Sequence, residues 1–244
     1  MIVLLWIGCA PSEYEFVDVV PDLVEDMPAA TAPIYFHTPQ SLWAWDPADP
    51  EPWRIGTFLD PDDRPLTTNI SDIAIDEEGR IFGCGGGAFF RIDPETALAV
   101  GIASSPAPMV GLAFREDGVL LGAGEDIYVI HPRLLTIIET FGSSSDINTI
   151  GDVVEGFDGN LIWSVRHERA GRLLIEMHPK SGAILAERPL DASQTYGLAA
   201  LDETVYAFTR AGNAFTIDHD TGEILARQFS SALEWWGASQ NPAR

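Results

Sequence analysis

Three histidines could bind a metal ion if the fold brought them together: His131, His178 and His219. His131 and His178 stand at the same place in a recurring pattern, an apolar stretch followed by His-Pro. Equivalent turns of a repeat protein point apart, whereas zinc ligands lie about 2 Å from one shared ion. We therefore predict no metal site and no cofactor, and we expect these histidines to be turn residues.

A glycine-rich run, Gly83-Cys84-Gly85-Gly86-Gly87, has the composition of a phosphate-binding loop. Neither a helix start nor a Lys-Ser/Thr pair follows it, so the phosphate-binding interpretation fails. Its place between two apolar stretches predicts a hairpin turn instead. Cys84 has no basic neighbour in sequence that would lower the pKa of its thiol, and we expect a buried, unreactive thiol.

Three acidic residues lie near stretches that we expect to form inner strands: Asp72, Asp152 and Glu234. Paired carboxyl groups in one pocket are the machinery of glycoside hydrolysis. None of the three stands in a motif of such an enzyme, and acidic residues are common throughout the chain. A hydrolase- or lyase-like enzyme is therefore an alternative hypothesis, and no catalytic residue is assigned.

The charge balance excludes one class of partner. The chain has 244 residues, with 37 acidic against 14 Lys and Arg, which gives a net charge of -23. Such a chain repels a phosphate backbone and gains nothing from counterion release. Nucleic acid is not an expected partner.

Residues 1–9 are an apolar run that ends in Gly8-Cys9. The run is too short to span a bilayer and suits the hydrophobic part of a signal peptide. It resembles the end of a bacterial lipoprotein signal, although Trp6 stands where Leu is usual. The resemblance implies acylation of Cys9, with the chain anchored to the cell envelope or secreted, and touching the membrane only through that lipid. Residues 10–33, acidic and rich in proline, are expected to form an extended tether, the alternative being an arm packed on the domain.

From residue 34 to 240 the chain repeats a strand–turn–strand pattern. Ile73–Gly83 and Leu112–Gly122 match at an offset of 39 residues (73 to 112), and weaker copies occupy Val153–Trp163 and Leu198–Phe208. A second signature follows each copy: an apolar strand, Asp or His, usually Pro, and then another strand. It centres on Asp46, Asp93, His131, His178 and Asp218. Turn-forming residues between alternating apolar stretches predict four short strands in each repeat of about 40 residues.

Repeated sets of four strands predict an all-β fold, a β-propeller of about five four-stranded blades. The first repeat lacks an inner strand, and the apolar C-terminal stretch Ala232–Ser239 is left over. We expect this C-terminal strand to close the ring. The pattern over roughly residues 40 to 235 resembles bacterial propeller repeats of the NHL, YVTN and quinoprotein-like kind, which implies the fold and leaves the function open.

The least regular element is the arginine-containing stretch 166–172, which lengthens the third repeat. Loops on a rigid scaffold usually carry function, and we place the binding surface on the loops that lead into the inner strands, the alternative being a solvated hairpin. The expected ligand- or partner-binding residues are Asn69, Asp146, Asn148, Arg166, His167, Arg169, Arg172, Gln194 and Tyr196. The leading hypothesis is a monomeric extracytoplasmic binding or scaffold module for a protein, small molecule or glycan. The alternatives are an enzyme with channel carboxylates and a structural subunit of an envelope complex.

Overall fold

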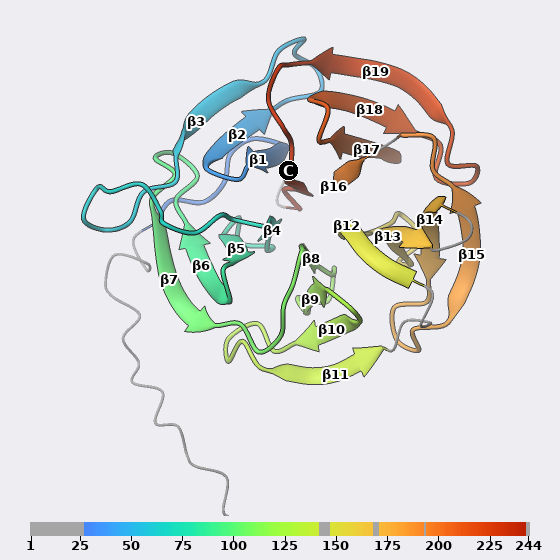
Figure 1. Cartoon of the computed structure of the whole chain (residues 1–244), viewed down its shortest axis with the longest axis horizontal. Helices are drawn as coiled ribbons and strands as arrows, with labels where there is room; N and C mark the ends of the chain where they lie inside the picture. The colour runs from blue at the N-terminus through green and yellow to red at the C-terminus, as the bar shows by residue number, and fades with distance from the viewer. Residues whose placement is uncertain (1–26, 142–146, 168–170, 193, 243–244) are drawn as a thin grey trace, which may run out of the picture.

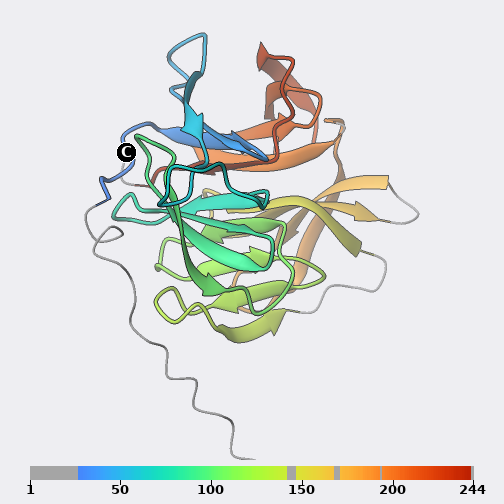
Figure 2. The same cartoon turned by 60° about the vertical axis from the view of Figure 1, so that its left-hand side comes forward.

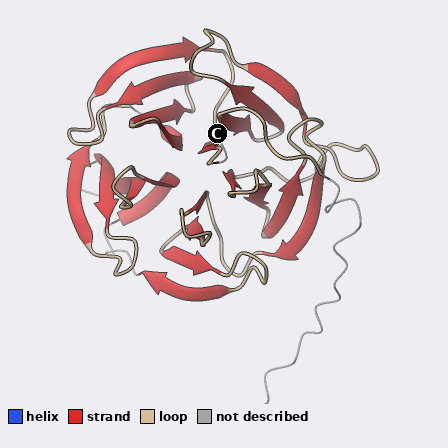
Figure 3. Ribbon diagram, turned by 180° about the vertical axis from the view of Figure 1, so that it is seen from behind, coloured by secondary structure: helices blue, strands red, loops and turns tan. Residues whose placement is uncertain are grey.

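The structure, a computed structural model, describes residues 27–141, 147–167, 171–192 and 194–242. Five four-stranded antiparallel sheets form a ring around one axis (Figure 1). Every regular element of the described residues is a strand, as Figure 3 shows from behind. Within those residues no helix has the length and apolar character needed to cross a membrane. The expected five-bladed β-propeller is confirmed.

Four blades consist of four consecutive strands that run from the axis outward. Blade 2 comprises β4 (Asp72–Ile75), β5 (Ile81–Gly85), β6 (Ala88–Ile92) and β7 (Ala99–Ser104). Blade 3 comprises β8 (Gly111–Phe114), β9 (Leu120–Ala123), β10 (Ile127–Ile130) and β11 (Ile137–Phe141). Blade 4 comprises β12 (Ile147–Glu155), β13 (Leu161–His167), β14 (Gly171–Met177) and β15 (Ile184–Pro189). Blade 5 comprises β16 (Thr195–Leu201), β17 (Thr204–Thr209), β18 (Asn213–Ile217) and β19 (Ile224–Ser230).

Blade 1 joins the two ends of the propeller domain. Its outer strands are β1 (Ile34–Thr38), β2 (Ser41–Trp45) and β3 (Trp53–Thr57), and its innermost strand is β20 (Gly237–Gln240), with Ala238 opposite Phe36. Closure by the C-terminal strand is therefore confirmed, but the strand is shorter than expected. Residues 231–236 form a loop because Trp235 turns into the core, where it is 0% exposed and meets Phe36 edge to face at 4.8 Å.

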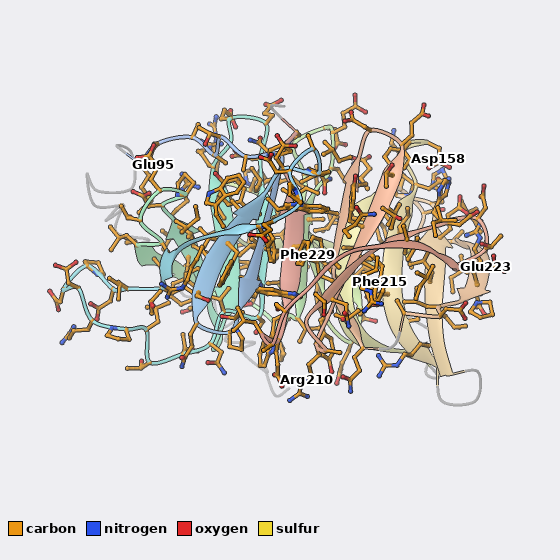
Figure 4. All side chains as sticks on the ribbon, turned by 90° about the horizontal axis from the view of Figure 1, so that it is seen from above. Glu95, Asp158, Arg210, Phe215, Glu223 and Phe229 are labelled. Atoms are coloured by element: carbon orange, nitrogen blue, oxygen red, sulfur yellow. The ribbon has the colours of Figure 1, made fainter. Side chains whose placement is uncertain are left out.

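The core lies between neighbouring blades, which pack face to face around the axis (Figure 2). Blades 1 and 5 share an aromatic cluster that contains Phe36, Trp45 and Phe208, and Phe229, labelled in Figure 4, meets Trp45 at 5.1 Å. Burying one large aromatic side chain stabilises a protein by roughly 3 kcal/mol or more. The aromatic residues thus fasten the blade that holds both ends of the domain.

The recurring Asp or His turn works through one side-chain acceptor. Asp93 Oδ1 accepts the N–H groups of Glu95 and Thr96 at 2.7 and 3.0 Å. His178 Nδ1 accepts the N–H groups of Lys180 and Ser181 at 3.3 and 3.2 Å, and His131 Nδ1 accepts equivalent bonds. Imidazole therefore replaces carboxylate in the same turn, and the assignment of these histidines to turns is confirmed.

The propeller has two faces, which we name the hairpin face and the loop face. Hairpins between the first and second strands of blades 2 to 5, such as 76–80 and 156–160, form the hairpin face, and the loops that lead into the inner strands form the loop face. Figure 4 shows Glu95 and Asp158 on one side and Arg210 on the other. Ala30 donates its N–H to Gly79 O at 2.7 Å, so the end of the segment expected as a tether lies against the hairpin face.

Candidate binding site at the channel mouth

The innermost strands approach the axis at an aligned position that is either Asp or Gly. Around the ring, this position holds Asp72, Gly111, Asp152, Gly197 and Gly237. The glycines are required by close approach, since a Cβ on Gly197 would lie 2.8 Å from the carbonyl carbon of Gly237. Both aspartates are 0% exposed.

These two carboxyl groups accept hydrogen bonds from all five inner strands. Innermost strands are sheet edges, so half of their N–H groups have no strand partner. The carboxyl of Asp72 accepts from Leu112 at 2.6 Å and also from Ile73. The carboxyl of Asp152 accepts from Val153 at 2.7 Å, from Leu198 at 2.9 Å and also from Ala238. The pair substitutes for the missing neighbouring strand and links the blades at the axis.

Burial controls the ionisation of this pair. Burial raises the pKa of Asp152 to about 7, against the pull of its N–H donors. Burial, and then the charge of Asp152, raises the pKa of Asp72 well above its ordinary value. Because a carboxyl in low dielectric resists becoming charged, burial moves the ionisation of this pair towards neutral pH.

His37 lies beside the pair and remains neutral. Burial lowers the pKa of His37 to about 4, while its Nδ1–H donates to Thr38 O at 2.8 Å. Its Nε2 faces Asp72 Oδ1 at 3.8 Å, and neither atom has a hydrogen-bond partner among the described residues. The backbone of Gly237 covers both, because a Cβ there would lie 1.9 Å from Asp72 Oδ1 and 2.5 Å from His37 Nε2. The closing strand therefore seals the plug formed by Asp72, Asp152 and His37.

A cavity of about 400 Å³ opens on the hairpin face above this plug, and we name it the channel cup. Residues from all five inner strands line it, and those directly above the carboxyl pair are Leu112, Val153, Leu198 and Ala238. Charged side chains at its rim are Glu77, Arg115, Glu116 and Glu155. Because the plug is buried, the cup has a closed floor.

The rim leaves its carboxylates more available than its one basic group. Half-buried Glu155 accepts the N–H of Glu116, and burial raises the pKa of Glu155. The Arg115 guanidinium is turned outward, where it donates to Asp117 and, at 3.0 Å, to Pro179 O. The rim therefore presents three carboxyl groups and one arginine, and Asp117 and Pro179 take three of the five N–H groups of that arginine.

Seven of the nine residues predicted to bind a ligand or partner belong to the described residues, and these seven lie on or near the loop face. Asn148, Arg166 and Arg172 form one cross-strand row on β12, β13 and β14. Tyr196, half-buried at the start of β16, bonds Arg210, which pairs with Glu234 at 3.1 Å. The other predicted positions are His167 at the end of β13, Gln194 just before β16 and Asn69, exposed just before β4. Asp146, Arg169 and Cys9 lie outside the described residues, as do the side chains of Asn148, Arg166 and His167.

The three acids considered as alternative catalytic groups occupy two separate places. Asp72 and Asp152 form the plug beneath the cup, and neither lines it. Glu234 lies on the loop face beside Arg210. Among the residues that the structure describes, no group of three or more His, Cys, Asp or Glu is placed to hold a metal ion. Cys84 is a free, buried thiol, as expected, and burial raises its pKa.

Sequence reasoning missed the residues of the cup. The repeat alignment places Glu155 where the other inner strands carry Ile75, Phe114 and Ala200, and Gln240 takes the same position in β20. The available signal was a charged residue at a repeat position that is apolar in three of the other four inner strands. The charge of Glu155 points to the hairpin face, whereas the irregular loops that the sequence analysis selected lie on the loop face.

Comparisons with known proteins show the fold alone. No family model matches the chain, and no curated protein matches its sequence. A glutaminyl cyclase from Myxococcus xanthus superposes with a TM-score of 0.50 at 16% identity, covering 71% of each chain. A symmetrical protein, from work on its de novo evolutionary emergence, superposes with a TM-score of 0.58 at 14% identity, covering 86% of this chain and 98% of its own. A Bacteroides caccae protein of unknown function gives 0.48 at 13% identity, with 80% and 71% covered.

Proposed function

We propose that this chain is an extracytoplasmic binding module that holds a small ligand in the channel cup. The observation that carries the proposal is a closed-floored cavity of about 400 Å³ lined by all five inner strands. Ligand pockets commonly enclose about 300 to 1,000 Å³ and are largely preformed. The plug supports this role, because it fixes the five strands that form the wall relative to one another.

The location remains the sequence-based part of the proposal. The Gly8-Cys9 junction supports a lipid anchor, and the acidic segment behind it supports a tether. Residues 27–33 lie on the hairpin face, so a tether attached there leaves the domain on the side that carries the cup. With the tether and the cup on the same side of the domain, the cup would face the envelope surface and would suit a ligand present there.

The test is a ligand screen with a matched pair of variants in one hairpin. Glu77 is exposed and lines the cup, whereas its neighbour Glu78 is exposed and does not. Glu77→Trp should narrow the mouth, and Glu78→Trp is the control. Saturation-transfer NMR of the full chain against a metabolite collection should find compounds whose signal is lost in Glu77→Trp and kept in Glu78→Trp. If every compound that binds is indifferent to Glu77→Trp, the cup is not the binding site.

A partner surface on the loop face is a second candidate function. The row of Asn148, Arg166 and Arg172 supports it, because two arginines stand opposite each other on an otherwise acidic chain. Guanidinium groups recognise carboxylate and phosphate with paired hydrogen bonds. This surface would suit a scaffold role in an envelope complex.

A further inference from the structure

The backbone of the inner strands determines which polar groups enter the channel cup. In an antiparallel pair, the N–H and C=O of one residue point to the same side, and successive residues alternate. Arg115 and Gly156 donate their N–H groups to the residues just before the second strand, Val119 O and Asn160 O, at 2.9 and 2.7 Å. The residues one and three positions earlier therefore direct their N–H and C=O groups towards the axis. In blades 3 and 4, these residues are Leu112, Phe114, Val153 and Glu155.

The floor of the cup is a ring of backbone carbonyl groups. Leu112, Val153, Leu198 and Ala238 each give their N–H to the plug, so their carbonyl oxygens also face the axis. The strands run towards the hairpin face, which places each carbonyl on the cup side of its own N–H. All four residues line the cup, and no described residue donates a hydrogen bond to these oxygens. The floor thus offers four hydrogen-bond acceptors.

The charges around this floor favour a cation. Three carboxyl groups line the cup, those of Glu77, Glu116 and Glu155, against the single basic side chain of Arg115. Arg115 lies close enough to Glu155 to lower its pKa, but Asp117 also pairs with the guanidinium, so negative charge is in excess at the rim. A cleft of one charge sign concentrates ligands of the opposite sign, and the net charge of -23 acts in the same direction. Hydrogen bonds between a charged donor and a carboxylate are about twice as strong as neutral ones.

We infer that the channel cup binds a small organic cation whose ammonium N–H groups donate to the carbonyl ring and to Glu155. This inference rests on the proposed function and names its ligand class. The N–H groups of Phe114 and Glu155 face the outer part of the cup by the alternation described above. The N–H of Gln240 does the same, because the next residue, Asn241, donates its N–H away from the axis to Pro33 O. They suit a hydroxyl or carbonyl oxygen elsewhere on the ligand. The polar groups of the plug beneath are buried and do not line the cup.

The test uses three probes of similar length and different charge: putrescine, butanediol and succinate. Isothermal titration of the full chain should show binding of putrescine and none of the other two. Glu155→Gln keeps an oxygen that can accept the Glu116 N–H and removes the charge, and it should weaken putrescine binding by about tenfold or more. The control, Glu78→Gln, lies outside the cup and should bind as the wild type does.

Each contrary result has a distinct meaning. Binding of butanediol or succinate that is abolished by Glu77→Trp, with no binding of putrescine, would keep the cup as the site and overturn the cation. Putrescine binding that is unchanged in both Glu155→Gln and Glu77→Trp would overturn the site itself. Calcium chloride is the inorganic comparison: tighter binding of calcium that depends on Glu155 and excludes putrescine would overturn the organic ligand.

Discussion

Replacing Asp152 with Asn tests whether the buried carboxyl pair holds protons at neutral pH. Asn has the same shape as Asp and cannot ionise, so the variant removes one titration from the plug. The pKa of Asp152 is raised from 3.8 to about 7 in the folded protein. Between these values the folded state binds a proton that the unfolded state has lost, so the stability contributed by Asp152 is full below about pH 4 and falls as the pH rises.

The size of the effect follows from the difference in pKa. One pH unit corresponds to about 1.4 kcal/mol, so the stability of the wild type relative to Asp152→Asn should fall by roughly 4 kcal/mol between about pH 4 and pH 7 and then level off. His37 acts in the opposite direction, because its lowered pKa of about 4 makes the folded protein lose stability as the pH drops below 6.5. His37 is present in both proteins, and its contribution cancels to first order in the comparison. Asp72 is also present in both, but the charge of Asp152 raises the pKa of Asp72 only in the wild type, so the loss of this coupling in the variant adds to the same downward trend.

Urea unfolding followed by tryptophan fluorescence, from about pH 4 to about pH 8, measures this difference. Asp49→Asn is the control, because Asp49 is an exposed turn residue between β2 and β3 and its replacement makes the same change of charge outside the plug. A profile for Asp152→Asn that matches the profile of this control would refute the reasoning. It would mean that Asp152 ionises as an ordinary surface carboxyl and that water reaches the plug.

Three further predictions concern closure, the loop face and the anchor. Gly237→Ala should destabilise the protein by roughly 1–3 kcal/mol or prevent folding, because the new methyl group meets Asp72 and His37. The control is Gly101→Ala, where the new methyl group has one neighbouring atom, at 3.9 Å. Equal melting temperatures of the two variants would contradict the sealed plug. Replacing Arg166, Arg169 and Arg172 with Ser should reduce capture of an anionic partner in pull-downs from envelope extract. The control replaces three exposed arginines that lie apart from one another, Arg54, Arg133 and Arg227, with Ser and should capture the partner as the wild type does. Equal losses in the two triple variants would mean that only net charge matters. With a complete signal sequence, the wild type should enter the detergent phase and Cys9→Ser should not; identical partitioning would exclude acylation.

The architecture could be predicted because it follows from patterns of residues that are close together in the sequence. Strand alternation, acidic-Gly hairpins and the Asp or His turn recur, and each depends on residues close together in sequence. Even the closing strand could be inferred, because one blade lacked an inner strand and one apolar stretch had no partner. The length of the closing strand could not be inferred, because whether 231–236 forms strand or loop depends on the packing of Trp235 against aromatic residues that are distant in sequence.

The site was harder to predict because it depends on contacts across the axis. Asp72 and Asp152 appeared as candidate catalytic acids, and sequence alone gives no sign that five backbone N–H groups would surround them. Whether an inner-strand side chain faces the channel, a neighbouring blade or solvent depends on the curvature of the ring. The repeat alignment nevertheless contained one usable clue, the charge of Glu155 at an apolar position.

The number of blades imposes a parity problem on the axis. Asp and Gly alternate around the ring at Asp72, Gly111, Asp152 and Gly197, but five is odd and strict alternation cannot close. The mismatch falls at β20, where Gly237 follows Gly197, so two small residues stand side by side and Asp152 takes three donors while Asp72 takes two. A ring of six with the same rule would be free of this frustration, with three carboxyls serving two strands each. The plug is asymmetric because the number of blades is odd, and the extra glycine that this requires lies in β20, the strand that closes the ring.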